Sequence, residues 1–354
     1  MAPQSGSVTA SEARRTATHF PCSHRPPPAE CQLLPGFPVR KITMATSALE
    51  LLLFACCVLP GLHSFALNQR PIVGILAQET FDPDLLPHGK YYIAAPYVKY
   101  LESAGCRVVP VRLNLTNDEY EKIFYSINGI LFPGGSSDVK TSAFAKVAKT
   151  FYNFALKAFD AGDYFPIWGT CLGMQLLTVL TAGKNLLINT ETENIALPLN
   201  LTYAAEFSEM FQQFPSDVYR ALSQEPLTGN FHHFSLSVKD FLQDEELRKF
   251  YSILSTNYDR KGVEFVSTME GIRYPFYGVQ WHPEVNRFQW QQRFAFPHSP
   301  NAVEVSYLLS DFFVNEARKN FHHFSNVKEE ETALIYNYSP HYVPTSSYIE
   351  VYFF

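Results

Sequence analysis

The chain of 354 residues carries 28 Lys and Arg against 34 Asp and Glu, which gives a formal net charge of −6. Hydrophobic residues make up 46% and charged residues only 18%, a composition that excludes disordered, collagenous and coiled-coil proteins. The negative charge argues against a nucleic-acid partner, which normally requires a basic face. Six cysteines are too few for a disulfide scaffold. No apolar run reaches the roughly 18 residues of a membrane span.

The N-terminal part differs from the rest of the chain. Residues 1–43 contain three consecutive prolines and scattered Arg and Ser, without helical or strand periodicity. From Met44 the chain leads into an apolar run, Leu51 to Leu62, and then into small residues ending at Ala66. This arrangement is typical of a secretory signal peptide. We therefore expect residues 1–43 to be a disordered upstream extension and residues 44–66 a cleaved signal; a buried core helix is the alternative.

An exported protein is also expected to carry glycans. Three Asn-x-Ser/Thr sequons follow the predicted signal, at Asn114, Asn200 and Asn337. Cleavage after Ala66 would leave Cys106 as the only cysteine besides the one discussed below.

Strand-like and helix-like stretches alternate from Pro71 onward. The predicted elements of the first half are, in chain order, a strand at 72–77, a helix at 95–105, a strand at 107–112, a helix capped near Asn117, a strand at 129–132, a helix at 142–160, a strand at 164–168 and a helix at 172–181. This alternation predicts an α/β fold, a three-layer sandwich with a central, mostly parallel sheet that is covered on both faces.

The second half has weaker periodicity. Residues 200–252 read as mixed and loop-rich. Three strand candidates follow, at 253–256, 263–268 and 276–281, and then a helix at 302–320. We expect one catalytic domain over residues 67–320, with the tail 321–354 packed on it or extending it.

One cysteine stands at a predicted strand-to-helix junction. Cys171 has Gly169 two residues before it and Gly173 two residues after it. This spacing predicts a nucleophile elbow, in which the turn is so tight that side chains at the two glycine positions would clash. The start of the helix favours negative charge and so the thiolate. A buried cysteine in an ordinary turn is the alternative.

A histidine and a glutamate lie two residues apart near the end of the last strand. In the sequence His282-Pro283-Glu284, the proline disfavours helix at the preceding residue. In an extended segment alternate residues face the same way, so Glu284 is expected to orient the imidazole of His282. Together with Cys171 they would form a Cys–His–Glu triad. A surface histidine beside a solvated glutamate is the alternative.

Consecutive glycines follow the predicted strand at 129–132. In the sequence Pro133-Gly134-Gly135, the absence of side chains lets a backbone N–H approach a ligand closely. Gly135 N–H and Leu172 N–H could therefore form an oxyanion hole. A plain glycine turn is the alternative.

These motifs resemble the class I glutamine amidotransferase superfamily and, over about residues 70–320, the γ-glutamyl hydrolase family, peptidase family C26. The strings that carry the resemblance are Pro71-Ile-Val-Gly-Ile-Leu-Ala-Gln78, Tyr97-Val-Lys-Tyr-Leu-Glu-Ser-Ala-Gly105, the Pro-Gly-Gly loop, Gly169-Thr-Cys-Leu-Gly173, Gly278-Val-Gln-Trp-His-Pro-Glu284 and Phe313-Val-Asn-Glu-Ala-Arg-Lys319. The resemblance implies the flavodoxin-like fold of class I glutamine amidotransferases. It also implies a lysosomal or secreted cysteine peptidase, a homodimer without a cofactor, that cleaves γ-linked glutamates from folate and antifolate polyglutamates.

The resemblance also assigns residues. Cys171 matches the nucleophile of the family, His282 the base and Glu284 the third member. His232 matches a second histidine near the substrate, and Gly134 and Gln175 are further expected substrate contacts. Well-known hydrolases of the family have a glutamate four residues after the nucleophile, whereas Gln175 resembles the amidotransferases.

Two histidine pairs, 232–233 and 322–323, do not predict a metal site. Adjacent histidines in a strand point to opposite faces, and no Cys or carboxylate completes a ligand set at a familiar spacing. Two rival functions remain from the sequence alone. One is a glutaminase that supplies ammonia to a synthetase, and the other is a secreted folate-binding protein without catalysis.

Overall fold

The computed structural model describes residues 67–354. The predictions for residues 1–43 and 44–66 lie outside this range. Among residues 67–354, no helix combines the length and the apolar character that crossing a bilayer requires.

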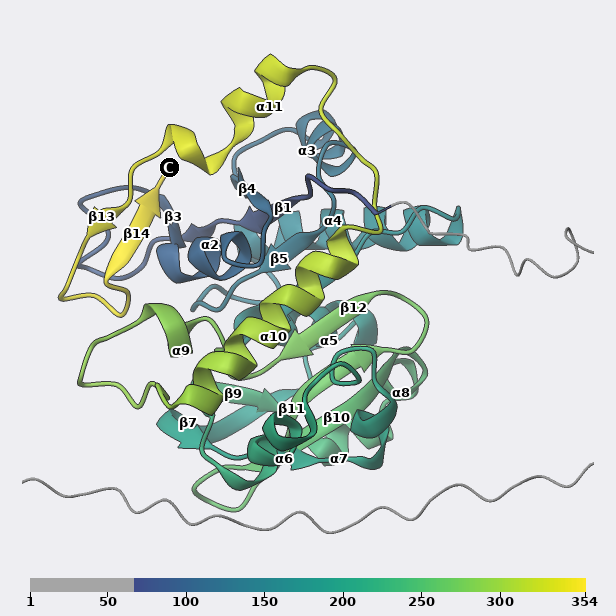
Figure 1. Cartoon of the computed structure of the whole chain (residues 1–354), viewed down its shortest axis with the longest axis vertical. Helices are drawn as coiled ribbons and strands as arrows, with labels where there is room; N and C mark the ends of the chain where they lie inside the picture. The colour runs from purple at the N-terminus through teal and green to yellow at the C-terminus, as the bar shows by residue number, and fades with distance from the viewer. Residues whose placement is uncertain (1–66) are drawn as a thin grey trace, which may run out of the picture. The chain divides into compact units, whose positions relative to one another are not determined.

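An eight-stranded sheet forms the centre of the fold (Figure 1). Its strands, from one edge to the other, are β4 (Arg107–Val111), β1 (Ile72–Leu76), β5 (Ile130–Phe132), β6 (Ile167–Thr170), β12 (Phe276–Val279), β11 (Glu264–Gly271), β10 (Tyr251–Tyr258) and β8 (Asn200–Leu201). The first five are parallel to one another, and the last three continue antiparallel. The predicted α/β fold with a mostly parallel central sheet is confirmed.

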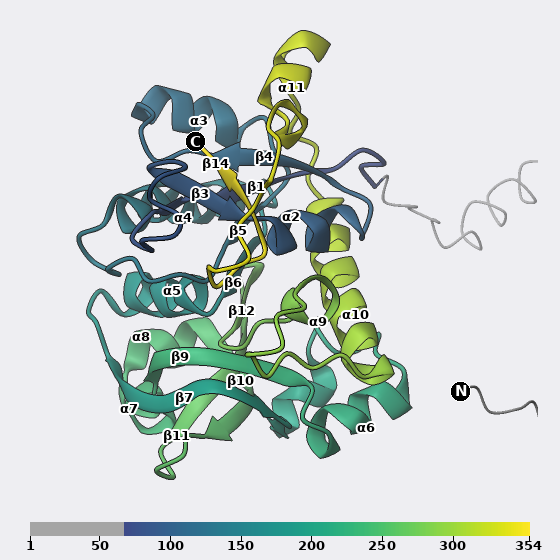
Figure 2. The ribbon, with the colours of Figure 1, turned by 90° about the vertical axis from the view of Figure 1, so that its left-hand side faces the viewer.

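Helices cover both faces of this sheet (Figure 2). They are α2 (Ala95–Glu102), α3 (Asn117–Phe124), α4 (Ala143–Asp160), α5 (Leu172–Ala182), α6 (Ser216–Gln224), α7 (Val238–Gln243), α8 (Glu245–Phe250), α9 (Val285–Phe288), α10 (Pro300–Ala317) and α11 (Val327–Ala333). Helices α4 and α5 lie on one side of the sheet, and α2 and α10 lie on the other. The two long helices begin alike, since Ser142 caps α4 and Ser299 caps α10 by accepting a backbone N–H.

The order of the strands brings three loops together. Strands β5, β6 and β12 are neighbours and run parallel, so their carboxyl ends lie at the same edge of the sheet. The Pro-Gly-Gly loop follows β5, Cys171 follows β6, and His282 lies shortly after β12. Ligands of open α/β sheets bind outside the carboxyl ends of the strands, so this edge is where a site is expected.

Two sequence predictions of secondary structure were wrong. The strand predicted at 164–168 is β6, and it begins only at Ile167, because Pro166 has no N–H to donate to the ladder. The stretch 200–252 is not loop-rich. It contains α6, α7 and α8 and a long strand, β9 (Thr228–Leu236).

A second, two-stranded sheet was not predicted. Strand β7 (Leu187–Leu197) pairs antiparallel with β9 to form a separate ribbon. In β7 the threonines at 190 and 192 are buried, whereas Glu191 is exposed and Glu193 is partly exposed. Buried and exposed residues therefore alternate in this part of β7, as in other half-buried strands, but the residues on both faces are polar.

The tail forms part of a third sheet. Its strands are, in spatial order, β13 (His341–Tyr342), β14 (Glu350–Phe353), β3 (Tyr91–Ala94) and β2 (Gln78–Glu79). Strand β14 pairs antiparallel with β3, so the C-terminus lies beside the N-terminal part of the domain (Figure 1).

Candidate active site

Cys171 occupies a strained turn between β6 and α5. It is the N-terminal cap of α5 with φ 51° and ψ −105°, a backbone conformation that L-residues rarely adopt. Its N–H donates to Val279 O at 2.8 Å, which ties the turn to the neighbouring strand β12. The side chain is 6% exposed and lines a cavity. The predicted elbow is confirmed.

The two glycines around the elbow have no room for a side chain. A Cβ on Gly169 would lie 2.6 Å from the carbonyl carbon of Gly173, as the sequence predicted. A Cβ on Gly173 would lie 2.0 Å from the carbonyl oxygen of Phe132, which belongs to β5. The turn is therefore packed against itself on one side and against the neighbouring strand on the other.

His282 joins Cys171 to Glu284. Its Nδ1 lies 2.7 Å from Glu284 Oε1, and its ring lies close enough to the Cys171 thiol for the two groups to interact. His282 and Glu284 are 5% and 1% exposed, so both contacts are shielded from water. The structure thus brings the three predicted residues into contact.

The contact between His282 and Glu284 does not arise from an extended segment. Strand β12 ends at Val279, and Glu284 is the helical cap residue of α9, with φ −65° and ψ −27°. The expectation that the two side chains meet holds, but a turn brings them together rather than strand alternation.

The charge of His282 follows from its surroundings. Burial lowers the pKa of the imidazole, but the charges of Glu284 and Cys171 and its hydrogen bonds to them outweigh burial and raise the pKa to about 10. These surroundings therefore favour the imidazolium over the neutral imidazole.

Tyr97 connects the Pro-Gly-Gly loop to the histidine. Its hydroxyl accepts the N–H of Gly134 at 2.8 Å and lies 3.4 Å from His282 Nδ1. A Cβ on Gly134 would lie 2.6 Å from His282 Cε1 and 3.3 Å from Cys171 Cβ. Gly134 therefore lets the loop approach the two residues. Tyr97 was not predicted as a site residue, although it lies in a predicted helix and begins one of the strings that carry the family resemblance.

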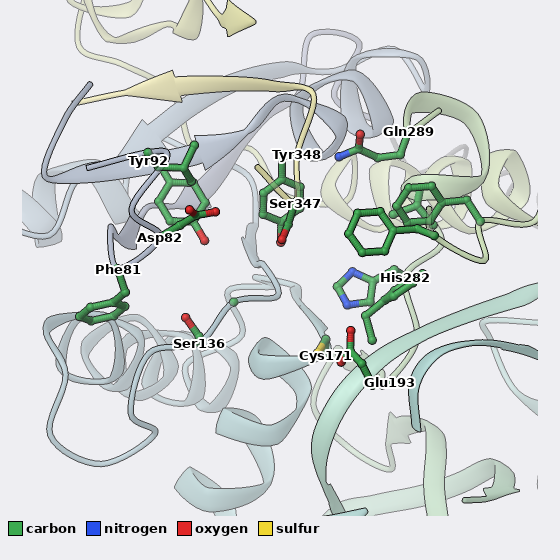
Figure 3. A pocket seen from close by; sticks show the side chains of 16 residues that line it. Phe81, Asp82, Tyr92, Ser136, Cys171, Glu193, His282, Gln289, Ser347 and Tyr348 are labelled. Atoms are coloured by element: carbon green, nitrogen blue, oxygen red, sulfur yellow. The ribbon is translucent and has the colours of Figure 1, made fainter. Parts of the chain in front are cut away.

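Two pockets meet at Cys171. The first has a volume of about 210 Å³ and is shown in Figure 3. It is lined by Phe81, Asp82, Leu85, Tyr92, Gly135, Ser136, Cys171, Glu193, Phe231, His282, Val285, Gln289, Phe294, Phe296, Ser347 and Tyr348. The second, of about 490 Å³, shares several of these and adds Ser137, Asp138, Val139, Leu172, Gln175, Asn185, Leu187, His232, His233 and Phe234. We call them the histidine-side pocket and the helix-side pocket.

The remaining predicted contacts lie in the helix-side pocket. Gln175 lines it, and its Nε2 donates to Phe234 O at 2.7 Å. His232 also lines it but is 3% exposed, and both ring nitrogens have protein partners, Nδ1 with Thr192 at 2.8 Å and Nε2 with Asn230 at 3.1 Å. Burial, and then the charge of His282, lower the pKa of His232 to about 3. The ring is therefore a neutral, fixed part of the wall.

Known proteins similar to this chain identify its family. Residues 71–284 match the Peptidase C26 family. The chain belongs to this family. It is 55% identical over 287 residues to γ-glutamyl hydrolase of Homo sapiens, a match that covers 81% of this chain and 90% of that protein. The enzyme of the same name from Bos taurus is 54% identical, with the same coverage.

Solved structures show a weaker likeness. The glutaminase domain of Trypanosoma brucei CTPS with bound acivicin is 16% identical, with a TM-score of 0.45 over 72% of this chain and 96% of that one.

The charged side chains that line this C26 site are mainly acidic. No Lys or Arg is among the described residues that line the two pockets, whereas Asp82, Asp138 and Glu193 are. Glu193 lies near Cys171 in Figure 3 and pairs at 3.4 Å with His233, whose ring is exposed. Apart from the histidines, the described side chains that could donate a hydrogen bond to a substrate carboxylate here are neutral.

The two histidines of the pair on β9 differ in exposure. On β9, His232 is buried and His233 exposed, on opposite faces of the strand. Within residues 67–354, no three or more His, Cys, Asp or Glu side chains are grouped so that they could hold a metal ion.

Proposed function

We propose that this protein hydrolyses γ-glutamyl bonds, with folate and antifolate poly-γ-glutamates as its substrates, through a γ-glutamyl thioester on Cys171. The contact of Cys171 with His282, and of His282 with Glu284, is the observation that carries the proposal. It occurs in a C26 chain that is 55% identical to a γ-glutamyl hydrolase.

The geometry supports a two-step reaction. The Cys171 thiolate attacks the γ-carbonyl carbon, and the N–H groups of Gly135 and Leu172 stabilise the oxyanion. His282 then gives its proton to the leaving amine as the C–N bond breaks. In the second step a water molecule gives a proton to His282 and attacks the thioester, the C–S bond breaks, and the thiolate and the γ-carboxylic acid are released; the acid then loses its remaining proton to the solvent. Glu284 holds the imidazole in place in both steps.

The substrate class is tested by the products of a folate pentaglutamate. Mass spectrometry is expected to show shortened glutamyl chains, together with free glutamate or short γ-linked peptides. Release of ammonia from free glutamine, with the pentaglutamate intact, would instead support a glutaminase. Tight binding of the pentaglutamate without any product would support a folate-binding protein.

The role of Glu284 is tested by the titration of His282. Burial lowers the pKa of His282, and the charge of Glu284 offsets this effect. Glu284→Gln removes that charge, so it should lower the pKa of His282 from about 10 by about one to three pH units. The imidazolium is present below that pKa, so it should be lost at a lower pH in the variant. NMR of histidine-labelled protein measures the midpoint directly. An unchanged midpoint would mean that Glu284 does not set the charge of the ring.

We also propose that the protein enters the secretory pathway, reaches the lysosome or the exterior, acts as a homodimer and is glycosylated. Asn114, Asn200 and Asn337 are all exposed. They differ in one respect. The Nδ2 atom of Asn337 donates to three backbone carbonyls, of Glu331, Thr332 and Leu334. A glycan on this nitrogen would disturb those bonds, so Asn114 and Asn200 are the better acceptors.

A further inference from the structure

One buried side-chain amide in the histidine-side pocket has no partner for its N–H groups. Gln289 is 0% exposed and follows the last turn of α9. Its Oε1 accepts the N–H of Ile349 at 3.3 Å, which fixes the orientation of the amide. Its Nε2 has no hydrogen-bond partner in the described part of the chain. Among the residues that line either pocket, this is the one buried side-chain atom left without a partner there.

A buried donor without an acceptor is rare in folded proteins and calls for an explanation. Gln289 lines the pocket, and Figure 3 shows its nitrogen turned toward the side where Tyr348 lies. The position of Gln289 is well fixed, because Gln291 and Arg293 form hydrogen bonds with the same part of the C-terminal tail. Gln291 Nε2 donates to Ser346 O at 2.9 Å, and Arg293 donates to Thr345 O at 2.8 Å. The amide is thus a preorganised donor at the wall of the cavity.

The two pockets have different parts in the proposed reaction. His282 lines only the histidine-side pocket, whereas Leu172 and Gln175 line only the helix-side pocket. The group that protonates the leaving amine must lie on the side of the leaving group. The histidine-side pocket therefore receives the leaving group, and the helix-side pocket receives the γ-glutamyl group that becomes the thioester. The former, at about 210 Å³, is smaller than the roughly 300–1,000 Å³ of a typical ligand pocket, so it suits a single residue.

We propose that Gln289 is a specificity-determining residue that donates a hydrogen bond from Nε2 to a carboxylate of the leaving glutamate. The proposal rests on the proposed function, since it assigns a contact within that reaction. It also accounts for the charges of the site. The pocket has no Lys or Arg among its described residues, and Asp82 and Glu193 are acidic. Apart from His282, its side-chain donors for a carboxylate are therefore neutral, and among them the amide of Gln289 is a buried donor without a partner in the described chain.

The test compares two substrates with the same acyl group. One is γ-glutamyl-glutamate, and the other is γ-glutamyl-n-butylamide, whose leaving group has no carboxylate. Both form the same thioester, and kcat/KM reports the steps up to its formation. Gln289→Leu removes the donor, and Gln289→Glu keeps an oxygen for Ile349 N–H but places a carboxylate where the donor was.

Both variants are expected to lower kcat/KM for γ-glutamyl-glutamate at least about tenfold, because a hydrogen bond to a charged group is lost. Their kcat/KM for the butylamide should stay within about twofold of wild type. Gln291→Leu is the matched control, since it removes a different hydrogen bond to the same part of the tail, from a residue that does not line the pocket. Its ratio between the two substrates should equal that of wild type.

An equal loss on both substrates would show that Gln289 acts only by holding the tail, and no loss on either would show that the amide does not contact substrate. Either result overturns the inference while wild type remains active. Failure of the wild-type protein to cleave either substrate would instead contradict the proposed function itself.

Discussion

Replacing Cys171 with alanine is expected to lower kcat for a γ-linked diglutamate by at least about 10⁴-fold, because no other group can form the thioester. The backbone at this position has a positive φ, which alanine must also adopt, so the fold should tolerate the change about as well as it tolerates cysteine. The residual rate, measured with high enzyme concentrations, reports only binding and the oxyanion donors.

Cys106 provides the matched control for this experiment. It is the other cysteine of the described chain and is buried, and its Sγ donates to Leu101 O at 3.3 Å, away from both pockets. Burial raises the pKa of its thiol. Cys106→Ala should therefore keep nearly full activity, and of the two cysteines within residues 67–354 iodoacetamide should label only Cys171 at pH 5. A Cys171→Ala variant with substantial turnover would remove the basis of the proposed mechanism.

Gly173→Ala should damage both stability and activity. Its Cβ would lie 2.0 Å from Phe132 O, and backbone atoms of the central sheet cannot move aside without breaking the pairing of β5 with β6. We expect a loss of about 3 kcal/mol or more in the free energy of unfolding. Since the elbow would shift against the Pro-Gly-Gly loop, kcat should fall by about 10²-fold or more.

Gly183, at the other end of the same helix, is the control. It adopts a left-handed conformation with φ 67°, but nothing lies within 4 Å of an added Cβ. Gly183→Ala should therefore cost only about 1–2 kcal/mol through backbone strain and leave kcat unchanged. Thermal unfolding and steady-state kinetics of the two variants separate these effects. Equal losses of stability and of kcat in the two variants would contradict the steric explanation for Gly173.

The parts of the site that the sequence predicted are those that local sterics or a short loop determine. The glycines around Cys171 are required by a turn of five residues, so their spacing alone indicates the elbow. The meeting of His282 and Glu284 was also predictable, because two residues of separation leave little freedom. Its geometry was not, since proline restricts the residue before it but does not determine the conformation that follows.

The other parts depend on contacts between distant segments. Tyr97 reaches Gly134 and His282 only because α2 packs beside the carboxyl ends of the strands. Strand β7 was missed because threonine and glutamate alternate along it, so a search for apolar alternation found no signal. Gln289 has no local pattern at all. Its significance lies in what surrounds it, namely a pocket wall with no acceptor for Nε2 among the described residues.

The backbone of Cys171 has a consequence for any attempt to make this enzyme more robust. A residue with φ 51° and ψ −105° is held there at a cost that the surrounding strands and helix must compensate. Glycine at this position would relax that cost and raise the melting temperature, but it would remove the sulfur. Stabilising substitutions must therefore be made away from the elbow, because at position 171 thermal stability favours glycine whereas catalysis requires cysteine.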